Sequence, residues 1–179
     1  MPTHIALLRG VNVGGNLLKM ERLRELCSQL DFHNVRTYVQ SGNVIFESPG
    51  SPGQCLQRLK EKLAGETRLP VAVVLRTATD LRGILEGNLF LTRRGIDRAK
   101  LHVTFLGSAA PKTASQALAA IDAGDDEFHV AGKEIYLHCP NGYGITRLSN
   151  TRIEKLLSIT ATTRNWNTVN KLYEMAMGS

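Results

Sequence analysis

The sequence predicts an α+β fold made of two similar halves. Short stretches of apolar residues have the length and alternation typical of strands, and longer stretches repeat apolar residues at the spacing typical of helices. These stretches follow one another in the same order twice along the 179 residues. Such a length, with an apolar fraction of 42%, is ordinary for one sizeable domain or two small ones.

In the first half, the sequence predicts a strand, a helix, a hairpin, a second helix and a last strand. The apolar run that opens the chain indicates a strand at the centre of a sheet, and glycines break it. Leucines at helical spacing, a turn at Gln40 to Asn43 and a run of branched residues mark the later elements. The expected elements are a strand at 4–13, a helix at Leu23 to Leu30, a hairpin over 35–47, a helix at Cys55 to Leu63 and a strand at 71–75.

The order β-α-β-β-α-β is that of a ferredoxin-like unit, and the second half follows the same order. Its expected elements are a strand at 101–106, a helix at 114–121, a hairpin of 128–130 and 134–138 that turns at Gly132, a helix near 148–157, an extended segment at 162–166 and a helix from near Thr168. We therefore expect two tandem ferredoxin-like halves packed together, although no residue-level repeat is visible. The expected domains are 1–78 and 90–179, joined by a segment at 79–89 with a helix at 79–86.

Composition restricts the classes of partner and compartment. The net charge of +6 is spread evenly over both halves and favours anionic partners, although a cationic solvated surface has the same composition. No stretch approaches the roughly 20 continuous apolar residues of a membrane span, so we expect no membrane partner. The N-terminus enters a strand-like run without the pattern of a signal peptide, which predicts a cytoplasmic protein.

Cysteine spacing points to no special chemistry. The three cysteines, Cys27, Cys55 and Cys139, are too scattered for a disulfide framework, and none has metal-binding spacing. We expect each of them to be a small buried hydrophobic residue.

A first polar patch lies between the first strand and the first helix. Glycines there allow close approach of the backbone to a ligand, and the N–H groups of a helix start attract anions. The patch fits neither a dinucleotide-binding nor a Walker loop. The alternative is a glycine-rich turn with a surface arginine. The candidate ligand contacts are Arg9, Asn12, Gly14 and Gly15.

A second polar patch lies along the first strand of the hairpin and its turn. Strand alternation places Arg36, Tyr38 and Gln40 on one face, while Val35, Thr37 and Val39 face the helices. In an isolated ferredoxin-like unit the first face is open, so that these residues and Asn43 could stack on a ring and bind it through hydrogen bonds. The alternative is that this face is covered and Tyr38 packs in a seam.

A third polar patch surrounds the single tryptophan, at the junction of an extended segment with the last helix. Arg164, Asn165 and Asn167 form a possible polar cradle, with Trp166 packed beneath it or stacked on a ligand. The alternative is that Trp166 anchors a core and the amides cap the helix. We expect Trp166 to be mostly buried and Arg164 to reach solvent.

The three patches contain no Cys, no His and no paired carboxylates, so the sequence names no catalytic residue, cofactor or metal site, and leaves open whether the protein is an enzyme. The acidic cluster from Asp122 to Glu127 is typical of a solvated turn. Our leading hypothesis is a binding module for a phosphate-bearing small ligand such as a nucleotide. The alternatives are nucleic-acid binding on an open sheet face, and a structural or partner-binding protein without a ligand.

The chain resembles, over essentially its whole length, a bacterial family of unknown function catalogued as domain of unknown function number sixteen-ninety-seven. The stretches that carry this resemblance are Ala6 to Gly15 with Lys19-Met20, Arg36 to Phe46, His102 to Leu106, and Ala161 to Val169. One departure is Thr146-Arg147-Leu148, where the family pattern has Ser-Lys-Leu. The resemblance implies that the three polar patches belong together, and it supplies no activity, substrate or catalytic residue.

Overall fold

The structure, a computed structural model, describes residues 1–12, 15, 17–39, 42–68 and 70–178. The chain forms two compact units, Met1–Arg82 together with Leu172–Ser179, and Gly83–Lys171. The expected domain bounds, 1–78, 79–89 and 90–179, remain a prediction. No helix within the described ranges combines the length and the apolar character that crossing a membrane requires.

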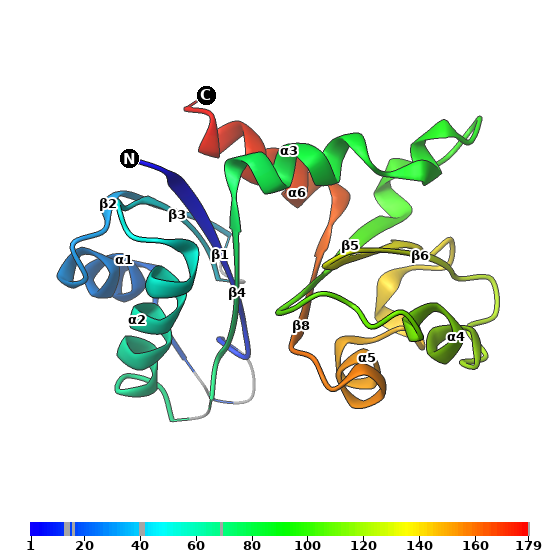
Figure 1. Cartoon of the computed structure of the whole chain (residues 1–179), viewed down its shortest axis with the longest axis horizontal. Helices are drawn as coiled ribbons and strands as arrows, with labels where there is room; N and C mark the ends of the chain where they lie inside the picture. The colour runs from blue at the N-terminus through cyan, green and yellow to red at the C-terminus, as the bar shows by residue number, and fades with distance from the viewer. Residues whose placement is uncertain (13–14, 16, 40–41, 69, 179) are drawn as a thin grey trace. The chain divides into compact units, whose positions relative to one another are not determined.

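The first unit is built on a four-stranded sheet with the order β2-β3-β1-β4, in which every neighbouring pair is antiparallel. Helices α1 and α2 cover one face of this sheet (Figure 1). The elements are β1 (Thr3–Arg9), α1 (Met20–Gln29), β2 (His33–Tyr38), β3 (Asn43–Glu47), α2 (Pro52–Ala64), β4 (Ala72–Thr77) and α3 (Ala78–Glu86), which continues into the second unit.

The second unit has the sheet order β6-β7-β5-β8, again with antiparallel neighbours, and helices α4 and α5 pack on one face. Its strands are β5 (Leu101–Leu106), β6 (Glu127–Ala131), β7 (Glu134–His138) and β8 (Ala161–Asn165). Its helices are α4 (Ala114–Ala119), α5 (Asn150–Leu157), the start of α6 (Trp166–Ala176), and three short 3-10 turns at Leu89–Thr92, Arg98–Lys100 and Tyr143–Ile145.

The α+β class and the predicted order of elements are confirmed, with two boundaries corrected. The first strand ends at Arg9 instead of Val13, because Gly10 and Asn12 adopt the left-handed region with φ of +91° and +58°. The last helix begins at Trp166 instead of near Thr168, because the side-chain oxygen of Asn165 caps it and accepts a hydrogen bond from the N–H of Thr168 at 2.8 Å.

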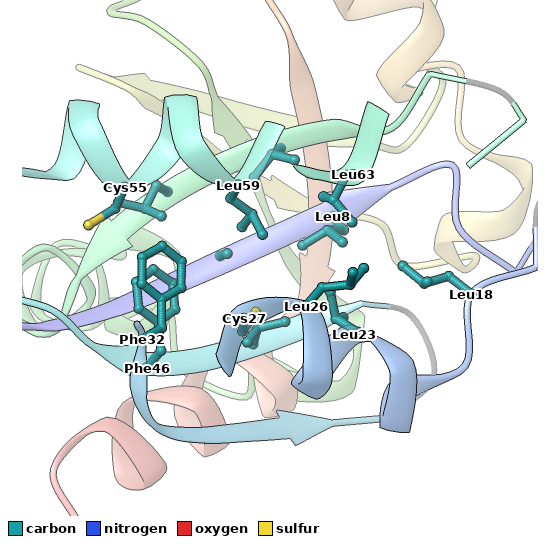
Figure 2. Packing of buried hydrophobic residues seen from close by; sticks show 14 of the residues in the cluster. Leu8, Leu18, Leu23, Leu26, Cys27, Phe32, Phe46, Cys55, Leu59 and Leu63 are labelled. Atoms are coloured by element: carbon teal, nitrogen blue, oxygen red, sulfur yellow. The ribbon is translucent and has the colours of Figure 1, made fainter. Parts of the chain in front are cut away.

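The core of the first unit lies between its sheet and its two helices. Figure 2 shows Leu23 and Leu26 of α1 and Leu59 of α2 directed toward Leu8 of β1. The rings of Phe32 and Phe46 stack nearby with centroids 4.1 Å apart. Apolar residues at helical spacing therefore close one face of the sheet, as the sequence pattern predicts.

The central strand pairs of the two units share one register: β1 with β3 and β4 matches β5 with β7 and β8. The N–H of Leu8 donates to the carbonyl of Gly42 at 2.8 Å, and the N–H of Leu106 donates to that of Lys133 at 2.8 Å. The β2–β3 pair contains a bulge between His33 and Arg36, whereas β6 and β7 pair without a shift, so equivalent positions can be assigned by strand pairing outside this bulge. Two polar residue types recur at equivalent positions: histidine as His4 and His102, and arginine as Arg76 and Arg164. The repeat that the sequence does not reveal is present at the level of register.

Candidate functional site

Strands β1 and β2 end, and strands β3 and β4 begin, at one end of the first sheet, shown at the bottom of Figure 1. We call the segments there, 9–20, 36–43 and 67–72, the loop end. Arg9 closes β1, Tyr38 closes β2 and Asn43 opens β3. The fold thus brings the first and second polar patches to the same end of one sheet.

Glycine allows these segments to approach one another closely. Gly42 has a φ of +83°, and a Cβ there would lie 2.8 Å from Cβ of Leu8 and 2.9 Å from Cγ2 of Val11. A Cβ on Gly10, whose φ is +91°, would lie 3.3 Å from the carbonyl oxygen of Pro70. The segments 36–43 and 67–72 therefore both approach the segment that follows β1 closely, and only glycine fits at Gly42.

Arg36 and Tyr38 lie on the sheet face opposite to the helices, as alternation predicts. Tyr38 pairs with Asn43, and Arg36 with Ile45. The hydroxyl of Thr37, between them, accepts a hydrogen bond from Nη1 of Arg24 on α1 at 2.7 Å, on the helix-covered face. Side chains of paired residues share a face, and side chains two residues apart on a strand do so too. Tyr38 pairs with Asn43, which pairs with Leu7, so Arg9 lies on the same face as Tyr38 and Arg36.

Arg36 has a polar atom that the fold does not satisfy. Its side chain is half-buried, and its Nε is buried without a hydrogen-bond partner among the described residues. Tyr38, also half-buried, is held at its backbone, because Nδ2 of the fully buried Asn43 donates to the Tyr38 carbonyl at 2.9 Å. An unsatisfied donor on a cationic group is costly, and an anionic ligand would offset that cost.

The other predicted residues of these patches have different placements. Asn12 organises the connection after β1, since its Oδ1 accepts a hydrogen bond from the N–H of Leu18 at 3.0 Å. Gly15 is exposed, with a φ of +81°. Gly14 and Gln40 lie outside the described residues.

The loop end is strongly cationic. Its three segments contain no Asp or Glu, and they contain Arg9, Lys19, Arg36 and Arg68, a formal charge of +4. Lys19 and Arg68 were not among the predicted ligand contacts, and they become relevant once the fold brings the three segments together. The signal that would have found them is the absence of acidic residues from all three segments.

The third polar patch lies in the second unit and has structural roles. Trp166 is 3% exposed, as expected, and Asn165 caps α6. The Trp166 carbonyl accepts a hydrogen bond from Nδ2 of Asn170 at 2.8 Å, and Asn167 is exposed. Asn165 therefore follows the capping alternative, while binding of a ligand here remains a prediction.

Arg164 is buried, contrary to the expectation that it reaches solvent. Only 8% of it is exposed, and its Nη1 donates to the hydroxyl of Thr162 at 2.7 Å and to the carbonyl of Thr163 at 2.9 Å. Burial lowers the pKa of Arg164 to about 10, so the guanidinium remains charged at neutral pH. The side chain folds back along β8, an edge strand of the sheet, and donates a hydrogen bond to the Thr163 carbonyl of that strand.

Thiol and metal chemistry have no support in the described part of the chain. All three cysteines are buried, as predicted, and burial raises the pKa of Cys27 to about 12 and that of Cys139 to about 11. Within the described ranges, no group of three or more His, Cys, Asp and Glu side chains is arranged to hold a metal ion. The acidic turn is held by hydrogen bonds from the segment after β7: the hydroxyl of Thr146 donates to Asp126 at 2.6 Å, and Nδ2 of Asn141 donates to Asp125 at 3.2 Å.

The second unit provides an internal comparison for the loop end. By strand pairing and its continuation, the positions of Arg9, Arg36, Tyr38 and Asn43 correspond to Gly107, His129, Ala131 and Glu134. The same register thus forms with a small residue at two positions and an acidic residue at a third. The strand pairing does not require the arginines, the ring or the amide of the first unit.

Comparison with known proteins gives two findings. The model of the family described as "Protein of unknown function (DUF1697)" matches residues 1–136. The fold is similar to the solved structure of a conserved bacterial protein from Streptococcus pneumoniae, with a TM-score of 0.76 and 24% sequence identity over 99% of each chain. No curated protein gives a match. At this identity the structural similarity concerns the fold alone.

Proposed function

We propose that this chain, which belongs to the DUF1697 family of proteins of unknown function, binds a phosphate-bearing small ligand at the loop end of its first sheet. Arg36 and Arg9 supply the charge that attracts the anion, and the loop backbones supply close contacts. A nucleotide is an example of such a ligand.

One observation carries the proposal. The same strand register is built twice, and only the first unit places two arginines, a tyrosine and an asparagine at the positions that the second unit fills with Gly107, His129, Ala131 and Glu134. Residues that a scaffold does not need for its own pairing are candidates for a role in binding. Their cationic and hydrogen-bonding character suits an anion.

Local electrostatics support the same ligand class. A loop end with a formal charge of +4 and no carboxylate concentrates anions near it. Helix α1 starts there; the side chain of its N-cap residue, Lys19, makes no capping hydrogen bond, and the first turn carries Glu21. The first N–H groups of α1 add a weaker attraction for negative charge.

We also propose that both units are ferredoxin-like. Each sheet has the β-α-β-β-α-β order of elements, with the first and last strands of the unit adjacent at positions three and four of the sheet. This connectivity leaves the loop after the first strand beside the hairpin turn, which supports the placement of the two polar patches.

The test is a ligand screen on the full chain by thermal shift, using orthophosphate, pyrophosphate, sugar phosphates and nucleotides. At least one of these probes should raise the melting temperature of the wild-type protein in a concentration-dependent way. Arg36→Gln should remove most of the shift. Arg24→Gln is the matched control, because Arg24 is half-buried near the same strand but contacts Thr37 on the opposite face.

If no probe shifts the wild-type protein, or if Arg24→Gln lowers the shift as much as Arg36→Gln does, the proposed site is wrong. A short single-stranded oligonucleotide in the same screen separates the nucleic-acid alternative. Binding confined to the oligonucleotide, and weakening steeply with salt, would favour that alternative over a small ligand.

A further inference from the structure

We propose that the ligand carries a planar aromatic ring beside its phosphate, as a nucleotide does, and that this ring lies on Tyr38 against Val39. The inference rests on the proposed function and adds the chemistry of the ligand's second part. Its evidence is the position of Tyr38, the last residue of β2, and the conformation and exposure of Val39, which follows it.

Val39 has a backbone conformation that its side chain disfavours. Its φ is +49°, in the left-handed region where a β-branched residue is an outlier. In the second unit the residue that follows the last paired residue of the first hairpin strand is Gly132, with a φ of +61°. Two residues separate the paired Ala131 and Glu134, whereas four separate the paired Tyr38 and Asn43. Both turns nevertheless begin with a left-handed residue, and the second unit uses glycine, which adopts this conformation without strain.

The Val39 side chain gains little packing in return, because 51% of it is exposed. An apolar side chain kept in a strained position and directed to solvent indicates a contact with something outside the chain. Leu17, in the connection after β1, is a second apolar residue of the loop end and is 78% exposed. Both lie in segments that carry no acidic residue.

Tyr38 is the aromatic residue at the centre of this arrangement. It lies between Arg36, about 7 Å away along β2, and Arg9, roughly 12 Å away across two strand spacings, on the same sheet face. A ring stacked on Tyr38 would place an attached phosphate within reach of either guanidinium. Ala131 holds the equivalent position in the second unit, which has no such ring.

The chemistry that fits is a base with a short link to a phosphate. Base stacking on an aromatic side chain adds affinity without selecting one base strongly, because every base has a π-face. A ligand with a phosphate but no ring would use only the arginines. The inference therefore predicts that nucleotides bind more tightly than phosphate esters without an aromatic ring.

The experiment is calorimetric titration of the full chain with pyrophosphate, ribose 5-phosphate and the four common ribonucleoside monophosphates. At least one nucleotide should bind about 10-fold or more tightly than ribose 5-phosphate. Tyr38→Leu should bring that nucleotide close to the affinity of ribose 5-phosphate, while the affinity for ribose 5-phosphate stays within about twofold.

Val39→Gly is an independent variant, because it adopts the conformation that Gly132 already has and should fold well. It should weaken nucleotide binding and leave ribose 5-phosphate binding unchanged. If ribose 5-phosphate or pyrophosphate binds as tightly as every nucleotide, the ring contact is wrong and the phosphate site stands. If none of the probes binds, the proposed function fails together with this inference.

Discussion

Arg76 and Arg164 hold equivalent positions on the edge strands of the two sheets, and each turns its guanidinium back onto its own strand. Nη1 of Arg76 donates to the carbonyl of Leu75 at 3.0 Å, and Nη1 of Arg164 donates to that of Thr163 at 2.9 Å. Both arginines are buried, at 5% and 8% exposure. An arginine in this position satisfies an edge carbonyl, which indicates a structural role.

Arg164→Ala should therefore destabilise the protein, by about 2–3 kcal/mol, because it removes charged hydrogen bonds and packing from a buried site. Trp166→Ala should cost about 3–5 kcal/mol as a large-to-small change in a buried position. Asn167→Ala is the control, because Asn167 is exposed and directly follows Trp166, and it should change stability by less than about 0.5 kcal/mol. Urea denaturation measures all three. An Arg164→Ala protein as stable as the control would show that the arginine is not structural.

Exchange of residues between the two hairpin turns should change stability in opposite directions. Val39→Gly should stabilise the protein by about 0.5–1 kcal/mol, since relief of left-handed strain exceeds the entropic cost of glycine. Gly132→Val introduces the same strain in the second unit and should destabilise by a similar amount. The unfolding midpoints of both variants in guanidinium chloride, compared with that of the wild-type protein, measure these changes. A loss of stability in Val39→Gly would show that Val39 is not strained.

Gly42 and Gly15 separate the effect of space from that of conformation. Both have positive φ, +83° and +81°, but only a Cβ on Gly42 would collide with neighbours. Gly15→Ala should cost about 1–2 kcal/mol from the left-handed conformation alone, and Gly42→Ala about 1–3 kcal/mol more from overpacking. Equal unfolding free energies for the two variants would mean that Leu8 and Val11 move aside without cost.

Stability should fall as the pH decreases below about 6.5. Burial lowers the pKa of His4 and of His102 from the ordinary value of 6.5, so the folded chain takes up these protons at a lower pH than the unfolded chain does. Below pH 6.5 the unfolded chain takes up these protons first, and the equilibrium shifts toward unfolding. Urea titrations at pH 7.5 and 5.5 should show this loss, and His4→Gln and His102→Gln should each make it smaller. An unchanged pH dependence in both variants would contradict the assignment.

A second loss of stability should appear at more acid pH and belong to Glu127. Two hydrogen bonds from Arg93, at 2.7 and 2.9 Å, and one contact with Nδ1 of His138 at 3.0 Å lower the pKa of Glu127 to about 2. Its contribution is present above about pH 4.5 and is lost as the pH falls toward 2. Glu127→Gln should reduce the difference in stability between pH 5 and pH 3, whereas Glu61→Gln, an exposed carboxylate on α2, should not. Both variants can be followed by circular dichroism during urea unfolding.

Local patterns predicted most of the elements. The strand at 101–106 matches β5, and the linking helix at 79–86 matches α3 to within one residue, because branched runs and helical spacing are properties of neighbouring residues. The faces of β2 were also predictable, since alternation along one strand places Arg36 and Tyr38 together. The exact ends of β1 and α6 were not, because they depend on a left-handed turn and on a side-chain cap.

The candidate site was only partly predictable. The sequence suggested Arg9, Arg36 and Tyr38 as contacts of one ligand but left open whether their patches meet, and strand pairing in the first unit places these three on one sheet face. It placed Val39 in the strand, facing the helices, which is wrong: β2 ends at Tyr38, and Val39 has a φ of +49° and is 51% exposed. It also assigned Arg164 to solvent, because burial of a charged side chain depends on its neighbours in space.

The sequence by itself determined the secondary structure, the α+β class and the chemistry of the polar patches, because these depend on residue type and local spacing. Only the tertiary structure decided which patches meet and which positions repeat. The pairing of β1 with β3 and β4, and of β5 with β7 and β8, fixes register between residues far apart in the chain. Register decides which side chains share a face. Most equivalent positions carry different residues, as Tyr38 and Ala131 do, with His4 and His102 and with Arg76 and Arg164 as exceptions. The repeat is therefore visible mainly in the backbone pairing.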